Sequence, residues 1–259
     1  MSAATQIKVT DISNEPRIAT HREWLAARKD FLTKEKQLTR LRDDLARQRR
    51  ELPWERVEQN YIFGAPHSRV TLAELFRGKS QLAIYHFMLG PDWPEGCPGC
   101  SLAADGFTGS IPHLEQRDVA FAAVSRAPIS QIEAFRKRMG WNFNWVSSLA
   151  CDFNFDYGVS FTPEQTAAKI PNYNYETAVF TQPEAPGLSV FARKGAEIFH
   201  TYSTYGRGLE PLLGVYHLLD WTPVGRGEEG LSMPMSWVRH HDKYENAPAG
   251  LPACCDHHK

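Results

Sequence analysis

Cysteine is scarce in this sequence, and long apolar runs are missing from it. Five cysteines in 259 residues are too few for the disulfide framework of a secreted scaffold, so we expect a reducing, cytoplasmic location. No stretch reaches the roughly 18 consecutive apolar residues of a membrane-spanning helix. Residues 1–8 lack the basic start and apolar core of a secretory signal. We therefore expect no membrane partner.

An excess of one charge is also missing. The formal net charge is −1 at pH 7, so no overall field draws the chain to nucleic acid, and we expect no nucleic-acid partner. Hydrophobic residues make up 42% of the sequence, which is ample for a core. The length fits one large domain or two small ones.

One cysteine motif stands out among the residues that are present. Cys97-Pro98-Gly99-Cys100 follows an apolar run at 82–89, which predicts a buried strand, and a turn-rich connector at 90–96. The first thiol of such a motif lies near a helix start, where unpaired N–H groups favour the thiolate. The second lies one turn further on, close enough to attack a mixed disulfide. The pattern indicates thiol–disulfide chemistry, with Cys97 attacking and Cys100 resolving.

Two other interpretations of this motif stay open. A CxxC is also half of a zinc site, and the C-terminal Cys254, Cys255, His257 and His258 offer further ligands. Alternatively, both cysteines are packed and unreactive. We favour redox chemistry, with neither metal nor cofactor, because a second CxxC is missing and because a strand precedes the motif. The Pro-Gly pair also favours a tight turn over a packed helix interior.

Three further side chains are candidates for the site. Trp93 either forms its aromatic rim or simply packs. His86, within the predicted strand, is either a buried base for Cys100 or a satisfied core histidine. Arg126 follows the second predicted strand, at the end where α/β ligands bind, and either stabilises a thiolate or substrate anion or forms a surface salt bridge.

A long N-terminal helix is predicted before the motif. Thr20 and Glu23 form a capping box, and the helix runs to about Leu52, where Pro53 stops it. Apolar residues recur every seven positions, at Trp24, Phe31, Leu38, Leu45 and Leu52. One interpretation is a helix that forms a homodimer. The other, which we favour, is a helix lying on its own domain with a solvated basic face, because the seam positions Ala27, Lys34 and Gln48 are weak.

The remaining elements define the fold class. Predicted strands alternate with helices as far as residue 162, and a β-hairpin at 188–202 and a helix at 209–219 follow. We expect an α/β fold with a central mixed sheet flanked by helices, a long N-terminal helix and an irregular C-terminal tail.

This order of elements, with CxxC after the first central strand, resembles the thioredoxin-like superfamily, and two segments, 72–85 and 145–159, are similar to its peroxiredoxin branch. The sequence also resembles the DUF899 family of bacterial thioredoxin-like proteins over roughly residues 15–245. Three stretches carry that similarity: Tyr85–Trp93 with the following CPGCS, Trp141–Trp145, and Met235–Asp242. The resemblance implies an arm and helix at 1–53, a thioredoxin-like domain at 54–222 and a tail at 223–259.

Departures from the better-known branches bear on the reaction. Peroxiredoxins carry a Thr three residues before the reactive Cys, where this chain has Pro94, and an Arg where it has Pro186-Gly187. Pro186 resembles the cis-proline that faces the CxxC of thioredoxins, although an ordinary turn residue is the alternative. These residues favour disulfide exchange with a protein or small-molecule disulfide. A peroxidase acting on peroxide, or a non-catalytic binding or dimerisation protein with a structural or zinc-bound CxxC, remain the alternatives.

A histidine pair in the tail completes the candidates. His240 and His241 lie between Trp237 and Asp242. They cover the site, bind a small ligand or belong to an interface, and their spacing does not separate these interpretations.

Overall fold

The computed structural model describes residues 16–170 and 172–245. The described residues divide into two compact units. One comprises the chain up to Pro53 together with His217–Gly230, and the other comprises Trp54–Tyr216 together with the residues from Leu231 onward. The predicted tail from residue 223 is therefore split between the two units.

Helix α1 (His21–Arg49) is the main element of the first unit. The predicted capping box is present, since the Thr20 N–H donates to Glu23 Oε2 at 2.9 Å and the Glu23 N–H donates to Thr20 Oγ1. The helix ends at Arg49, three residues before the predicted end, with Arg50 as its C-cap. Its apolar seam is exposed, with Trp24 and Phe31 both 56% accessible. The homodimer stays a prediction.

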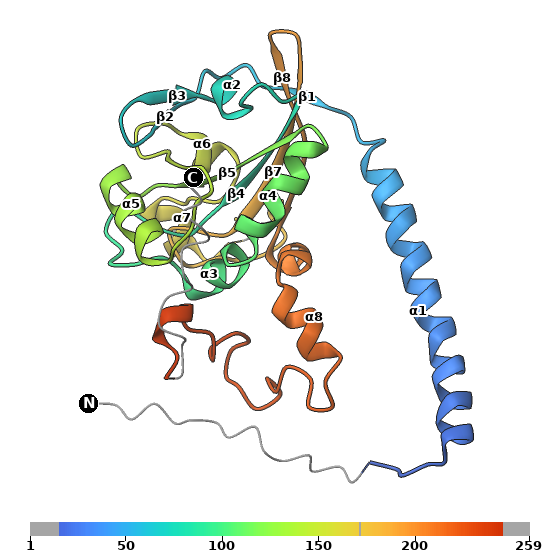
Figure 1. The fold of residues 1–259 in the computed structure, drawn as a ribbon. Helices are drawn as coiled ribbons and strands as arrows, with labels where there is room; N and C mark the ends of the chain where they lie inside the picture. Colours follow the sequence, from blue (N-terminus) through green and yellow to red (C-terminus); the bar gives the residue numbers. More distant parts are fainter. Residues whose placement is uncertain (1–15, 171, 246–259) are drawn as a thin grey trace, which may run out of the picture. The chain divides into compact units, whose positions relative to one another are not determined.

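The second unit is built on one eight-stranded sheet in the order β1-β8-β7-β4-β5-β6-β2-β3 (Figure 1). The strands are β1 (Glu55–Arg56), β2 (Ile62–Gly64), β3 (Arg69–Thr71), β4 (Gln81–His86), β5 (Val119–Ser125), β6 (Trp145–Ser147), β7 (Gly187–Lys194) and β8 (Glu197–Tyr205). β4, β5 and β6 run parallel, whereas β7 is antiparallel to both β4 and β8. This strand pattern confirms the mixed, thioredoxin-like α/β sheet predicted from the sequence.

Short helices connect these strands. They are α2 (Leu72–Leu75), α3 (Pro98–Ala104), α4 (Phe107–Gln116), α5 (Ile129–Arg138), α6 (Phe153–Asp156), α7 (Pro163–Ala168) and α8 (Gly214–Asp220), with 3₁₀ turns η1 (Gly206–Leu212) and η2 (His241–Lys243). The helix predicted after the CPGC motif is divided into α3 and α4 at Asp105–Gly106. No helix within 16–170 and 172–245 combines the length and the apolar character needed to cross a bilayer.

Strand β4 separates two packed faces. Leu82 and Ile84 are fully buried in a cluster that includes Phe153 and Phe191, while Tyr85 packs edge-on against Phe107 at the start of α4. Successive side chains of a strand point to opposite faces, so neighbouring residues of β4 belong to different surroundings.

The central position of β4 predicts a large effect of truncation there. Leu82→Ala removes a fully buried side chain, and we expect it to lower the free energy of unfolding by about 2–5 kcal/mol. The matched control is Leu149→Ala, at a side chain that is 44% exposed, which should change it by about 0.5 kcal/mol or less. Urea denaturation of both variants measures the difference, and equal midpoints would contradict the placement of β4.

Candidate functional site

The CPGC motif lies where the chain turns from β4 into α3. The Cys97 N–H donates to the Met88 carbonyl at 3.0 Å, which folds the connecting loop back onto the end of the strand. Cys97 is the N-cap of α3, and Pro98 takes the first helical position, where its fixed φ and missing N–H cost nothing. The Cys97 carbonyl accepts both the backbone N–H and the hydroxyl of Ser101. Cys97 is thus fixed at the strand-to-helix junction that the sequence predicts.

The two thiols lie in unequal surroundings. Cys97 is half-buried and Cys100 is buried. A hydrogen bond from the Cys100 thiol and backbone hydrogen bonds from Cys100 and Gly99 lower the pKa of Cys97 to about 7, although burial opposes them. Burial, with the adjacent Cys97, raises the pKa of Cys100 well above its usual range. Cys97 therefore ionises first, while Cys100 keeps its proton and donates a hydrogen bond to the Cys97 thiolate.

Tyr85 contacts the buried thiol, and the sequence analysis did not single it out. Its hydroxyl donates to Cys100, which tends to lower the pKa of that thiol. Tyr85 is itself buried, and burial keeps its own pKa well above 10. Strand alternation could have pointed to Tyr85, because neighbouring strand residues point to opposite faces and residues 85 and 86 cannot both face the same thiol.

His86 lies on the opposite face of the sheet, so the expectation that it acts as a base for Cys100 is wrong. Its Nε2 is 2.8 Å from Ser189 Oγ, and its ring stacks on Phe153 and Tyr157. Burial lowers the pKa of His86 to about 3. It is a neutral core histidine, but its buried Nδ1 has no hydrogen-bond partner in the described part of the chain, so it is not the satisfied residue of the alternative interpretation.

Arg126 and Trp93 lie near the loop that leads to Cys97. The Arg126 guanidinium is 3.4 Å from Glu184 Oε1 and lies over the Phe155 ring. Burial raises the pKa of Glu184 to about 7. The half-buried Trp93 indole and the Glu184 side chain both lie within 3.4 Å of the point where a Cβ on Gly90 would stand. In the part of the chain that the structure describes, no hydrogen bond or ion pair joins Arg126 to either thiol of the motif.

Pro186 precedes β7 without the geometry expected from the resemblance. No cis peptide bond occurs among the described residues, so the cis-proline role is wrong for Pro186. Its carbonyl accepts a hydrogen bond from the Tyr173 hydroxyl. The following Gly187 approaches Val159 and Tyr205 so closely that a Cβ would lie 2.9–3.0 Å from their side chains. Pro186 lies directly before β7, and Gly187 is the first residue of that strand, so neither residue forms a turn.

The C-terminal segment, residues 231–245, packs against the loop before Cys97. His240 is buried, and its Nε2 is 2.8 Å from the Gly96 carbonyl. Because a carbonyl only accepts, Nε2 carries the proton and Nδ1 accepts from Arg138 at 3.3 Å. Met235 lies over the turn of the motif, since the point where a Cβ on Gly99 would stand is 3.1 Å from its Cε and 3.7 Å from Cys97 Sγ. Of the three interpretations of the histidine pair, covering the site fits these contacts.

Ion pairs hold this segment in place. Arg138 binds Asp242 at 2.7 Å and Glu95 at 2.8 Å, and Lys243 binds Glu95 at 2.6 Å. The Lys243 and Arg138 contacts lower the pKa of Glu95 to about 2, so this carboxylate stays charged at neutral pH. His241 Nδ1 lies 2.8 Å from Asp105, just beyond α3. The loop before the motif and the end of α3 are therefore bridged to the C-terminal segment.

Cys151 is a free thiol outside the motif. Cys151 is half-buried at the edge of the core, and burial raises its pKa. Cys254 and Cys255, with His257 and His258, lie outside the described residues.

The fold and the site define a thioredoxin-like α/β protein with a CxxC dithiol at the end of its central strand. The sequence profile described as "Bacterial protein of unknown function (DUF899)" matches residues 13–244, and the chain belongs to this family. No curated protein sequence matches the chain.

Solved structures of peroxiredoxins are similar to part of this chain. A mutant of PrxQ from Xylella fastidiosa has 13% identity and a TM-score of 0.42, over 64% of this chain and 94% of that one. Peroxidoxin BcpB from Mycobacterium tuberculosis has 11% identity and a TM-score of 0.42, over 65% and 97%. The mitochondrial 2-cys peroxiredoxin from Plasmodium falciparum has 14% identity and a TM-score of 0.41, over 64% and 93%. Similarity at this level says nothing of the reaction.

The hydrogen bonds to Cys97 predict how its reactivity depends on pH. The thiolate is the form that reacts, so alkylation of Cys97 should rise with pH to a midpoint near its pKa of about 7. Cys100→Ala removes the strongest of those hydrogen bonds and should move the midpoint toward higher pH. Mass mapping after brief alkylation assigns each thiol, and Cys151→Ser is the control that leaves the profile unchanged. An unshifted midpoint in Cys100→Ala would contradict this account.

From the contacts of His240, we expect this residue to limit the access of reagents to Cys97 without changing the pKa of Cys97. His240→Leu leaves the Gly96 carbonyl without its donor, which should cost about 1–3 kcal/mol of stability and loosen the C-terminal segment. Cys97 should then be alkylated faster above pH 8, where it is ionised in both proteins, with the same midpoint. His240→Gln, which keeps a donor, should restore the slower rate. Equal rates for all three proteins would show that the segment does not shield the thiol.

Proposed function

We propose that this protein is a thiol–disulfide oxidoreductase that acts through Cys97 and Cys100 in a reducing cytoplasm. The observation that carries the proposal is the pairing of a half-buried thiol of lowered pKa with a buried thiol that donates a hydrogen bond to it. The Cys97 thiolate is thereby suited to attack a substrate disulfide, and the Cys100 thiol is suited to resolve the mixed disulfide afterwards. Disulfide exchange requires these two roles.

The reaction proceeds in two exchanges. The Cys97 thiolate attacks one sulfur of a substrate disulfide, the substrate S–S bond breaks, and the departing thiolate takes a proton from solvent. Cys100 then loses its proton and attacks Cys97 Sγ, which releases the second substrate thiol. The substrate gains two electrons and two protons, and the protein is left with a Cys97–Cys100 disulfide. A separate dithiol reductant must return it to the reduced form.

Peroxide reduction is the second candidate, because a thiolate of lowered pKa also attacks an O–O bond. Cys97 would become a sulfenic acid with release of water or an alcohol, and Cys100 would displace a second water to close the disulfide. Pro94 and Pro186-Gly187 stand where peroxiredoxins carry Thr and Arg, so the peroxide oxygens lack two of their usual partners. Disulfide exchange is therefore the better-supported reaction.

The test is reduction of insulin with dithiothreitol as the reductant. Cys97→Ser should reduce the catalysed rate to the uncatalysed background, because no attacking thiolate remains. Cys100→Ser should accumulate a mixed disulfide at Cys97, which mass spectrometry detects. Cys151→Ser is the matched control and should keep full activity.

The other outcomes distinguish the alternatives. A wild-type rate in Cys97→Ser would refute both catalytic candidates at this motif. Rapid sulfenic acid formation at Cys97 with stoichiometric peroxide, combined with no insulin reduction, would favour the peroxidase. Zinc in the purified protein, with neither thiol open to alkylation, would favour the non-catalytic interpretation.

A further inference from the structure

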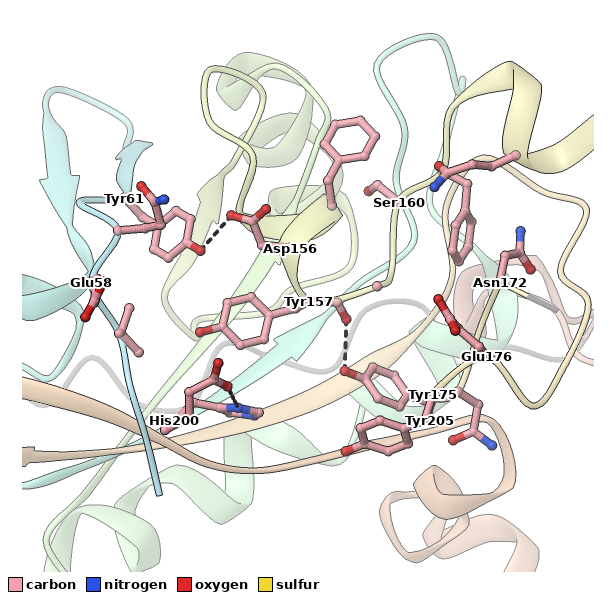
Figure 2. Close-up of a pocket in the computed structure, with 18 of the residues that line it drawn as sticks. Glu58, Tyr61, Asp156, Tyr157, Ser160, Asn172, Tyr175, Glu176, His200 and Tyr205 are labelled. Atoms are coloured by element: carbon pink, nitrogen blue, oxygen red, sulfur yellow. Dashed lines mark hydrogen bonds and ion pairs between the residues drawn. The ribbon is translucent and has the colours of Figure 1, made fainter. Parts of the chain in front are cut away.

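A large pocket opens on the face of the sheet that carries His86, away from Tyr85 and the dithiol. Its volume is about 830 Å³. Four segments, at 55–61, 155–161, 172–176 and 200–205, line it together with Gln165 of α7 (Figure 2). The ring of Tyr157, which stacks on His86, lies in the middle of this wall. The proposed redox chemistry does not use the pocket.

The charge of the lining is strongly negative. Glu55, Glu58, Asp156 and Glu176 all face the pocket, and Arg56 is the one cationic side chain among the described residues that line it. The Arg56 guanidinium is paired with Glu197 and lies over the Phe199 ring, so its charge is already compensated. Across 16–170 and 172–245, no salt bridge engages Glu58, Asp156 or Glu176.

Tyrosine rings make up much of the remaining wall. Tyr61 and Tyr157 have ring centroids 6.3 Å apart with planes at 59°, and Tyr175 and Tyr205 have centroids 5.3 Å apart with planes at 75°. The negative face of an aromatic ring attracts cations, most strongly those with diffuse charge.

Hydrogen bonds hold the rings in place before any ligand arrives. The Tyr61 hydroxyl donates to Asp156 Oδ2 at 2.7 Å, the Tyr205 hydroxyl to the Tyr157 carbonyl at 2.9 Å, and the Tyr175 hydroxyl to the Ser203 carbonyl at 2.9 Å. Figure 2 shows Tyr157 between the Tyr61–Asp156 pair and His200. The Nδ1 of His200 is 3.5 Å from Glu55 Oε2. A wall built in advance costs little ordering entropy on binding.

We propose that this pocket binds a small organic cation, of the substituted ammonium class, between the tyrosine rings and the carboxylates. The uncompensated carboxylates attract its charge, and the rings accept its alkyl groups. The same carboxylates repel an anion. A bare metal ion fits poorly, because no three His, Cys, Asp or Glu side chains of the described residues converge closely enough to ligate one.

The test is calorimetric titration of the full-length protein with choline at low ionic strength. The matched probe is the carbon isostere of choline, an uncharged alcohol of the same shape. We expect saturable binding of choline that weakens with added salt, and at least about ten-fold weaker binding of the isostere, the ratio that corresponds to 1.4 kcal/mol. Equal affinities would overturn the proposal, as would no choline binding at about 10 mM, well beyond the range of a specific site.

Variants locate the binding. Tyr157→Leu removes a ring and should weaken choline binding about ten-fold, whereas Tyr157→Phe keeps the ring and should leave it unchanged. Glu58→Gln, at an exposed residue whose loss does not threaten folding, should weaken it several-fold at low salt only. Choline binding that is unaffected by both Tyr157→Leu and Glu58→Gln would overturn the proposal. Cys97→Ser should bind choline normally, so the outcome is independent of the proposed redox reaction.

Discussion

The hydrogen bond between the Cys97 and Cys100 sulfurs is the interaction on which the candidate site depends. It exists because the two residues lie one turn apart at the start of α3, with one sulfur half-buried and the other sealed against β4. The buried thiol donates a hydrogen bond to its neighbour and stabilises the Cys97 thiolate. If both sulfurs were exposed, water would compete for the bond and the pKa of Cys97 would approach that of an ordinary thiol.

The alternation of side chains along β4 gives the molecule two chemically separate faces. Tyr85 reaches the buried thiol, while its neighbour His86 begins a hydrogen-bonded line that crosses β7 and β8 through Ser189 and Ser203 to His200. His200 lies at the wall of the pocket, 3.5 Å from Glu55. The dithiol and the pocket wall therefore share no side chains, although Tyr173 packs on the Tyr205 ring of the wall and interacts electrostatically with Cys100.

Local patterns in the sequence predicted local structure well. The capping box of α1, the strand before the motif and the position of Cys97 all follow from residues close together in the chain, and the structure confirms them. Contacts between distant residues could not be predicted this way. His240 meets Gly96 across 144 positions, and nothing near either residue signals the other. Pro186 shows the limit of resemblance, since a shared proline does not fix the isomer of its peptide bond.

The order of the two thiol pKa values determines which exchange is harder. Attack by Cys97 needs no proton transfer above pH 7, because the thiolate is already present. Attack by Cys100 requires a buried thiol to ionise, and part of what opposes that ionisation is the charge on Cys97. Formation of a mixed disulfide removes this charge, so the pKa of Cys100 falls at the step that needs its thiolate, and the Tyr85 hydroxyl remains to stabilise it. The same hydrogen bonds stabilise the reduced protein relative to its disulfide, because no thiolate remains in the disulfide to accept them. The Cys97–Cys100 disulfide is therefore a stronger oxidant than a disulfide between two ordinary cysteines. Reduction of the Cys97–Cys100 disulfide by a dithiol reductant is therefore favoured at equilibrium. Reduction of a very stable substrate disulfide by the protein is not.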